Sequence, residues 1–300
     1  MNRVVGIDAD LIVYAAGFVL EKRIKNNEKA DINNAQQIVD TIIRKILRES
    51  KATHYLGFLT SGKDNFRLTL ATTLKYKGNR DKAKQTPLPF KQEMLNYMIV
   101  HWGFQMMKGV EADDALTIAG EYFRDRPETY ILATKDKDLW QWPGEHFNMN
   151  TNQLMFINEE EGNRNLWKQV IVGDMGTDNI PGLSYAAKHD VWTTKVNRHG
   201  TPDYSILPEH KYGPKAAEAI LDSVDPKDYA ATILELYLTA YPWDVDLGHA
   251  RFEETFALVY MLLEKPEGLK LHYDYRECSK KDLEAPSGFE GYRATLQSEF

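Results

Sequence analysis

Val4-Val5-Gly6-Ile7 is a short, continuous apolar run that ends in Asp8. Such a run predicts a strand buried on both faces of a parallel sheet. Residues 54–59 and 129–133 are two further strand candidates of the same kind. Apolar residues at helical spacing predict helices at residues 38–47, 90–100 and 112–123. Because strands alternate with helices, the sequence predicts an α/β fold with a mostly parallel central sheet flanked by helices.

The second half of the chain has a more helical pattern. Residues 170–173 fit either a strand or a helix, and the predicted helices that follow are residues 215–221, 229–237 and 252–263. The polar residues 184–211 contain Gly200, Pro202 and Pro208, which predict a long loop or hairpin. We therefore expect an α/β core at residues 1–172 and a helical region at residues 173–300 that carries residues 184–211 as an insertion.

The composition predicts a soluble cytoplasmic protein. Hydrophobic residues make up 43% of the 300 residues, enough for a large core. The longest apolar stretch, residues 11–20, is half of what a membrane span needs, and the acids Asp8 and Asp10 at its edge argue against a secretion signal. The single Cys278 excludes an intramolecular disulfide and a multi-cysteine zinc site.

The net charge of −7 is unevenly distributed along the chain. Residues 74–91 carry a local charge of +5, whereas residues 222–300 carry −8. A solvated charged face explains the basic run as well as a phosphate-binding patch does. An acidic protein with one basic segment is nevertheless compatible with nucleic acid held at one place.

Four clusters of acidic residues follow predicted strand ends or begin predicted helices. They are Asp8 with Asp10; Glu111 with Asp113 and Asp114; Asp136 with Asp138; and Asp174 with Asp178. Each pair alone is explained by helix capping or a turn. Together they would repel one another strongly unless hard divalent cations such as Mg²⁺ or Mn²⁺ bind between them. Two such ions about 4 Å apart form the usual clamp for phosphodiester hydrolysis.

These residues carry a resemblance to a known family. The chain resembles the 5′-nuclease superfamily, which includes flap endonucleases, the 5′-exonuclease domain of bacterial DNA polymerase I and phage 5′-exonucleases. The matching motifs occur in the family order and are Gly6-Ile7-Asp8, Tyr76-Lys77-Gly78-Asn79-Arg80, Glu111-Ala112-Asp113-Asp114, Asp136-Lys137-Asp138, Gly173-Asp174, Asp178-Asn179-Ile180-Pro181-Gly182 and Tyr212-Gly213-Pro214-Lys215. The long segment between Gly182 and Tyr212 favours the phage-type branch.

The resemblance implies a structure-specific 5′ nuclease that hydrolyses DNA from or near 5′ ends, with 5′-3′ exonuclease and flap endonuclease activity in DNA replication and repair. It implies two Mg²⁺ or Mn²⁺ ions per active site. Asp8, Glu111, Asp113 and Asp114 would hold one ion; the acids around the second would be Asp136, Asp138, Asp174 and Asp178.

The resemblance also assigns the contacts to DNA. Lys77 and Arg80 would face the scissile phosphate at the base of a short helical arch around residues 78–95. A helical clamp similar to a helix-hairpin-helix would grip the duplex. The further DNA-binding candidates are Lys75, Tyr76, Lys82, Lys84, Lys195, Arg198, Gly213 and Lys215. The expected partners are DNA with 5′ ends, flaps or nicks, and also RNA–DNA hybrids; a monomer without membrane contact is expected, in the host cytoplasm if phage-encoded.

Two departures from the family pattern leave questions open. Thr60 stands where an aspartate is usual, and either Asp10 or Asp64 is a candidate to replace its charge. Asp174 and Asp178 are four residues apart, one more than in the family, so the carboxylate that reaches the second ion is not assigned.

Two alternative functions remain. Asp8-Ala9-Asp10, Thr60 and the segment from Gly173 to Asp178 resemble motifs of a Mg²⁺-dependent phosphatase of the haloacid-dehalogenase type. That alternative leaves the basic run and the remaining acids unexplained. A catalytically impaired DNA-binding relative is the other, supported by Thr60 alone.

Overall fold

The computed structural model describes residues 2–62, 64–80, 87–196, 200–207 and 211–284. The chain forms two compact units. The first unit consists of residues 1–65, 86–158 and 261–300, and the second unit of residues 66–85 and 159–260. Over the described ranges, no helix is both long enough and apolar enough to cross a membrane.

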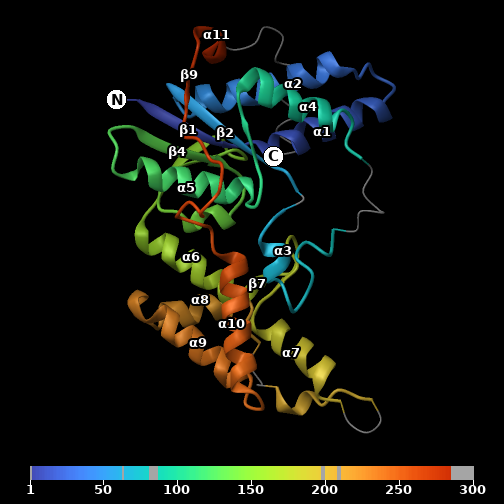
Figure 1. Cartoon of the computed structure of the whole chain (residues 1–300), viewed down its shortest axis with the longest axis vertical. Helices are drawn as coiled ribbons and strands as arrows, with labels where there is room; N and C mark the ends of the chain where they lie inside the picture. The colour runs from blue at the N-terminus through green and yellow to red at the C-terminus, as the bar shows by residue number, and fades with distance from the viewer. Residues whose placement is uncertain (1, 63, 81–86, 197–199, 208–210, 285–300) are drawn as a thin grey trace. The chain divides into compact units, whose positions relative to one another are not determined.

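The first unit contains the predicted sheet (Figure 1). Its strand order is β3-β2-β1-β4-β5-β6, with β9 added beside β2. The strands are β1 Arg3–Asp8, β2 His54–Thr60, β3 Gln105–Met107, β4 Thr129–Thr134, β5 Gly144–Asn148, β6 Gln153–Ile157 and β9 Arg276–Glu277. Strand β1 pairs in parallel with β2 and with β4, as do β2 with β3 and β4 with β5, whereas β6 and β9 pair antiparallel with their neighbours. The predicted mostly parallel α/β sheet is therefore confirmed.

Helices cover both faces of this sheet. The helices of the first unit are α1 Ala9–Lys25, α2 Ile32–Glu49, α4 Lys91–Tyr97 with the π-helical turn η1 Met98–Trp102, α5 Ala112–Arg124, the 3₁₀ turn η2 Asp138–Gln141 and α11 Lys280–Leu283. Val5 and Ile7 belong to the core cluster of α1 and α2. Gly6 between them faces Leu116 of α5 on the opposite face. A Cβ at Gly6 would lie 1.9 Å from the Tyr130 hydroxyl oxygen, so this strand needs glycine where α5 and β4 approach it.

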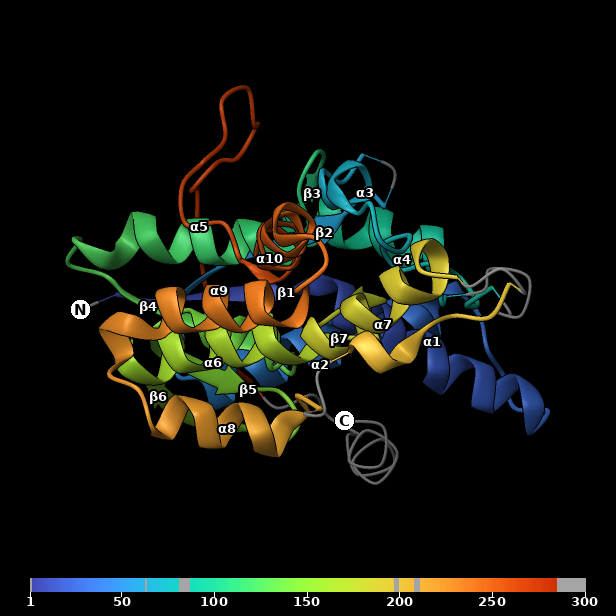
Figure 2. The same cartoon turned by 90° about the horizontal axis from the view of Figure 1, so that it is seen from below.

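The second unit is mainly helical. Its elements are α3 Arg67–Leu70, α6 Glu159–Val172, β7 Gly173–Asp174, β8 Ile180–Pro181, α7 Leu183–Thr194, η3 Tyr204–Ile206, α8 Pro214–Asp222, η4 Pro226–Asp228, α9 Tyr229–Ala240 and α10 Val245–Val259. Helices α6, α8, α9 and α10 pack around one apolar core, which includes Ile233, Tyr237 and Leu258 (Figures 1 and 2). The predicted helical second half is thus observed, although α10 ends at Val259 and does not continue to residue 263.

The structure corrects two predictions about organisation. Residues 184–211 are not wholly a loop or hairpin, because α7 runs to Thr194 and buries Leu183, Ala187 and Val191 at helical spacing. An antiparallel bridge between Val196 and Pro202 follows it. The compact units also do not divide at residue 172. Helix α6 places Trp167, Val170 and Ile171 in the core of the second unit, whose longer stretch therefore begins at Glu159 with α6; the unit also includes residues 66–85.

Candidate functional site

Acidic residues gather where β1 and β4 end in the first unit. Asp8 is the last residue of β1, and Thr134 is the last residue of β4. The Thr134 hydroxyl donates to Asp8 Oδ2 over 3.0 Å and accepts the Asp136 backbone N–H, also over 3.0 Å. Because the two strands are parallel neighbours, their carboxyl ends meet at one edge of the sheet. Thr134 therefore links Asp8 to Asp136 at that edge.

Asp8 is buried in an environment that opposes its charge. The residue is 3% exposed. Burial, together with the charges of Asp10 and Asp136, raises the pKa of the Asp8 carboxyl to about 8. Among the residues that the structure describes, no ion pair reaches Asp8 or Asp136. A cation at this edge would relieve the repulsion that raises this pKa.

Asp10 places a carboxylate beside Thr60, whose own side chain carries no charge. Both Oδ atoms of Asp10 accept the Thr60 backbone N–H, over 3.1 and 3.2 Å. The Thr60 hydroxyl accepts the Ala112 N–H over 2.9 Å and so links the end of β2 to the start of α5. These contacts favour Asp10 over the exposed Asp64 as the replacement carboxylate. Asp10 was not among the assigned ligands, although its position two residues after Asp8 was a usable signal.

Glu111 and Asp114 form the N-terminal cap of α5. The buried Asp114 accepts the Glu111 N–H at Oδ2 and the Leu262 N–H at Oδ1, each over 3.2 Å. Glu111 is the N-cap residue and, in return, accepts a backbone N–H of the first turn. Asp113, between them, is half-buried. Since both Asp114 oxygens accept backbone donors, the geometry supports Asp114 as a residue that orders the start of α5, and its assignment as a ligand stays a prediction.

Asp138 and Asp136 order the turn after β4. The Asp138 N–H donates to Asp136 Oδ1 over 2.9 Å. In the described ranges, no three Asp, Glu, His or Cys side chains form a ready-made metal-binding group. The chemistry at this edge still suits a hard cation, because the candidate donors are carboxylate oxygens and because burial and acidic neighbours raise the pKa of Asp8. The first unit therefore supplies six of the eight predicted ligands, and the other two belong to the second unit.

In the second unit, Asp174 folds a turn between two short strands. Strands β7 and β8 pair antiparallel, Gly173 with Pro181 and Asp174 with Ile180. The Asp174 carboxylate accepts the Thr177 N–H over 3.0 Å and the Asp178 N–H over 3.2 Å. Gly173 has a φ of 69°, and a Cβ there would lie 2.2 Å from the Gly182 nitrogen. The glycine in Gly173-Asp174 is therefore a steric requirement of this turn.

Asp178 joins this turn to the basic run. Its carboxylate accepts the Tyr76 hydroxyl over 2.9 Å and Arg80 Nη2 over 2.7 Å. Lys77 Nζ lies 3.7 Å from Asp178 Oδ2, and the Lys77 N–H donates to the Asp178 carbonyl over 2.7 Å. The side chain of Asn79 donates to the carbonyl of Met175 over 3.0 Å and to that of Gly176 over 2.8 Å. The two cations predicted to face phosphate are thus held together by one carboxylate, a pairing that the sequence did not reveal.

The other predicted DNA contacts have mixed outcomes. Tyr76 is 3% exposed and packs in the core of the second unit, and its role as a DNA contact stays a prediction. Lys75 is exposed, Lys195 is half-buried at the C-cap of α7, and Lys215 is exposed in the first turn of α8. Gly213 is the N-cap of α8 and places no side chain over its backbone N–H groups. Lys82, Lys84 and Arg198 lie outside the described residues, as does part of the predicted arch.

Known proteins resemble this chain over different lengths. DNA polymerase I of Bacillus subtilis (strain 168) is 32% identical over 145 residues, which are 47% of this chain but only 16% of the polymerase. The chain thus spans about one sixth of that relative. A bacteriophage T5 flap endonuclease solved with DNA and metal ions matches with 18% identity and a TM-score of 0.49, covering 86% of this chain and 99% of its own. A T5 5′-exonuclease with bound zinc matches with 17% identity and a TM-score of 0.48, covering 87% and 100%.

The family assignment depends on the N-terminal half of the chain. Residues 3–167, more than half of the chain, match the family described as 5′-3′ exonuclease, N-terminal resolvase-like domain. This range contains β1, β4 and α5, and with them Asp8, Asp136 and Glu111. The chain belongs to this 5′-3′ exonuclease family and thereby to the 5′-nuclease superfamily.

Proposed function

We propose that this protein is a divalent-metal-dependent 5′ nuclease that hydrolyses DNA phosphodiester bonds from or near 5′ ends. The observation that carries the proposal is the edge of the sheet at Asp8. A carboxyl whose pKa is raised to about 8 by burial beside Asp10 and Asp136 is destabilising for a fold that gains nothing from it. A divalent cation bound there would offset that cost by its attraction to the carboxylates.

The ions would be held by the acids of the first unit. Asp8, Asp10 and Asp136 are the core of this proposal, joined by Glu111, Asp113 and Asp138. Mg²⁺ or Mn²⁺ would lower the pKa of a bound water and neutralise charge on the reacting phosphate. Two ions are the expectation that follows from the family, and Asp174 and Asp178 stay predicted ligands of the second. Thr134 would keep Asp8 and Asp136 in place through its two hydrogen bonds.

Lys77 and Arg80 would supply positive charge to the phosphate that reacts. Hydrolysis adds negative charge to a phosphate that is already anionic, so a fixed cation stabilises the transition state more than the ground state. Both side chains are paired with Asp178. That carboxylate would hold them in place until a phosphate competes for them.

Helix ends and basic side chains of the second unit would bind the DNA duplex. The N-terminus of α8 at Gly213 presents backbone N–H groups, and Lys215 adds a charge beside them. Lys75 and Lys195 would add to affinity without touching the reacting bond. The proposed partner is DNA with 5′ ends, flaps or nicks, and the protein would act on it as a monomer.

Family membership argues against the phosphatase alternative. That alternative makes Asp8 a nucleophile, and beryllofluoride trapping on Asp8 would be its signature. The impaired relative is separated from an active nuclease by one assay. Cleavage of 5′-flap, nicked, blunt duplex and single-stranded DNA is compared with Mg²⁺, Mn²⁺ or EDTA. We expect metal-dependent cleavage of substrates that have 5′ ends; the absence of cleavage with either metal contradicts the proposal.

A further inference from the structure

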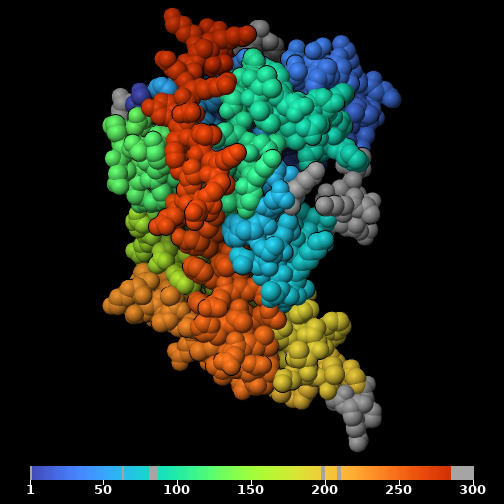
Figure 3. Space-filling view, in the orientation of Figure 1, coloured from blue at the N-terminus to red at the C-terminus, as the bar shows by residue number. Residues whose placement is uncertain are grey.

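The segment that carries Lys77, residues 66–80, is anchored to α10 near its N-terminal end. Arg67, almost fully buried, donates through Nε to the Leu258 carbonyl over 2.9 Å and through Nη2 to the Tyr260 carbonyl over 2.8 Å. Its guanidinium therefore caps the C-terminal end of α10. All these residues belong to the second unit. The segment runs over the surface of that unit in cyan (Figure 3).

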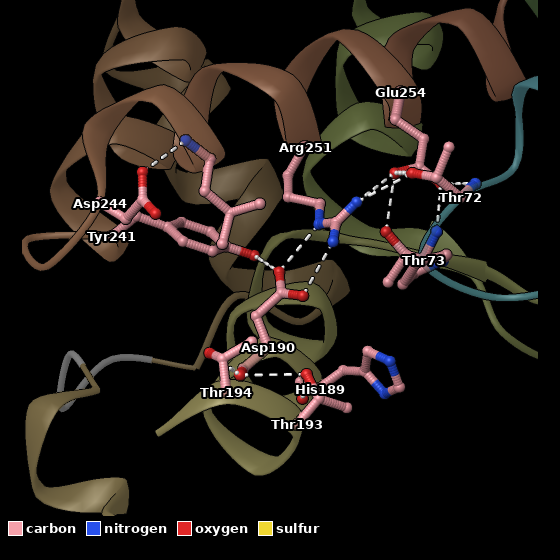
Figure 4. A network of polar contacts seen from close by, with 12 residues as sticks. Thr72, Thr73, His189, Asp190, Thr193, Thr194, Tyr241, Asp244, Arg251 and Glu254 are labelled. Carbon is pink, nitrogen blue, oxygen red and sulfur yellow. Dashed lines mark hydrogen bonds and ion pairs between the residues drawn. The ribbon is translucent and has the colours of Figure 1, made fainter. Parts of the chain in front are cut away.

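A second anchor lies closer to Lys77 and depends on Glu254. Its carboxylate accepts four hydrogen bonds from two consecutive residues (Figure 4). The backbone N–H groups of Thr72 and Thr73 donate to Oε1 over 2.6 and 2.7 Å. Their hydroxyls donate to Oε2 over 2.8 and 2.7 Å. Two successive backbone N–H groups aimed at one oxygen fix the direction of the chain at this point.

Arg251 fixes the orientation of Glu254 in turn. Its Nη1 donates to Glu254 Oε2 over 2.8 Å and to the Thr72 hydroxyl over 3.0 Å. Its Nε and Nη2 bind the two oxygens of Asp190 on α7 over 2.8 and 2.9 Å, and the Tyr241 hydroxyl donates to the same Asp190 (Figure 4). The carboxylates are 4% exposed for Asp190 and 7% for Glu254. Such a buried, bidentate arrangement holds each side chain in one geometry.

Lys77 follows Thr73 by four positions, which limits the distance between their Cα atoms to about 14 Å. Tyr76, between them, is buried in the core of the second unit. Lys77 itself has a φ of 54°, a conformation that non-glycine residues adopt rarely. A change at Glu254 would reach Lys77 through this short stretch, which is held at Thr73 and at Tyr76.

We propose that Glu254, oriented by Arg251, is a positioning residue that sets the place of Lys77 for the reaction. This inference rests on the proposed function, in which Lys77 stabilises charge on the reacting phosphate. Glu254 would not touch DNA. Its contribution would be to keep the ammonium of Lys77 where the transition state needs it, since small displacements of such groups lower rates strongly.

The test is a double-mutant cycle on single-turnover cleavage of a 5′-flap substrate with Mg²⁺ at saturating enzyme. We expect Glu254→Gln to lower the rate by about 10- to 100-fold. The Kd for DNA should change by less than about threefold, because many phosphate contacts remain. In a Lys77→Ala background, Glu254→Gln should cost less than about threefold, because the group that it positions is gone. If Glu254 had a purely structural role, Glu254→Gln would lower the rate by the same factor in the Lys77→Ala background as in the wild-type protein.

Matched variants separate positioning from folding. Glu253→Gln, one residue earlier on the same helix with a side chain 67% exposed, should leave the rate unchanged. If Glu254→Gln fails to fold, Thr72→Val removes one hydroxyl donor and should show a smaller loss with the same dependence on Lys77. Equal costs with and without Lys77, or a wild-type rate in Glu254→Gln, overturn this inference while leaving the nuclease function intact. A wild-type protein without metal-dependent cleavage overturns both proposals.

Discussion

Two buried acidic clusters in this protein handle their charge in opposite ways. In the second unit, Asp190 and Glu254 share Arg251, and hydrogen bonds from Thr73 and Thr72 outweigh burial, so the pKa of Glu254 lies below its ordinary value. In the first unit, Asp8 is equally buried, and burial with its acidic neighbours raises its pKa to about 8. Donors from the chain itself thus favour the charged form of Glu254, whereas the surroundings of Asp8 oppose its charge.

Whether built-in partners favour the charged form distinguishes acids that stabilise the fold from acids that we expect to bind a ligand. A carboxylate whose partners are all built in stabilises the fold without help from solution. A buried carboxyl surrounded by like charges costs stability, and proteins retain such groups mainly where they bind or react with something. On this basis we expect Asp8 and Asp136 to serve the proposed function and Asp190 to stabilise the fold.

Removing a functional acid should have the largest effect. We expect Asp136→Asn to lower Mg²⁺-dependent cleavage by about 10³-fold or more, because one ligand of the ion and one negative charge are lost. DNA binding measured with Ca²⁺ in place of Mg²⁺ should stay the same or tighten, since repulsion of phosphate decreases. Asp125→Asn, at the exposed C-terminal end of α5, is the control. Near-wild-type turnover of Asp136→Asn would show that the metal assignment is wrong.

Removing Arg251, the cation shared by Asp190 and Glu254, should instead destabilise the protein. We expect Arg251→Met to lower the free energy of unfolding of the second unit by about 3–5 kcal/mol, because two buried carboxylates lose their cation. Chemical denaturation followed by tryptophan fluorescence measures this change. Lys227→Met removes an exposed cation that pairs with Asp225, and it should change stability by less than about 1 kcal/mol. Similar values for the two variants would mean that Asp190 and Glu254 do not depend on Arg251 for their stability in the fold.

Lys77 should matter for rate and little for affinity. We expect Lys77→Ala to slow single-turnover cleavage by about 10²–10³-fold, as for other lost transition-state donors. The Kd for DNA should change little, because one contact among many is removed. Lys75→Ala, on an exposed neighbour, should leave the saturated rate nearly unchanged. Identical rates for the two variants would mean that Lys77 has no specific role and that the basic run acts only as a charged surface.

The pKa of Asp8 predicts how stability depends on pH in the absence of metal. Between its ordinary value of 3.8 and about 8, the folded protein keeps a proton on Asp8 that the unfolded chain has released. Stability contributed by this group therefore falls as pH rises through that window, with a limiting slope of about 1.4 kcal/mol per pH unit. Asp8→Asn should remove this component, measured in EDTA as the difference between the two stability profiles. Parallel profiles would mean that Asp8 is ionised in the fold.

The sequence was sufficient for the elements with strong periodicity. Strands β1, β2 and β4 are continuous apolar runs, and α5, α8 and α9 show clear helical spacing, so all six were predicted. Strand β6 was missed because four of its five residues are not buried, and Phe156 is 68% exposed. Helix α7 was missed because its apolar positions are interrupted by polar residues, among them the buried Asp190, which needs Arg251 from α10.

Within the candidate site, positions were predictable and partners were not. Asp8 and Asp136 follow directly from locating two strand ends. The pairing of Asp178 with Arg80 joins residues 98 positions apart, and that of Glu254 with Thr72 spans 182. No local pattern specifies contacts over such separations, and Asp178 could be assigned from the motif only as an acid near metal. Its bonds to Tyr76 and Arg80 became apparent from the folded second unit alone.

The division of the first unit into three stretches has a consequence for synthesis on the ribosome. Residues 261–300 return to this unit after the second unit is complete, and they provide β9 for the sheet and the Leu262 N–H for Asp114. Translation proceeds from the N-terminus, so the second unit has all its residues before Leu262 emerges. The unit that begins first along the chain is therefore the last to be finished. Until then a nascent chain lacks the backbone donor that holds Asp114 beside the acidic edge.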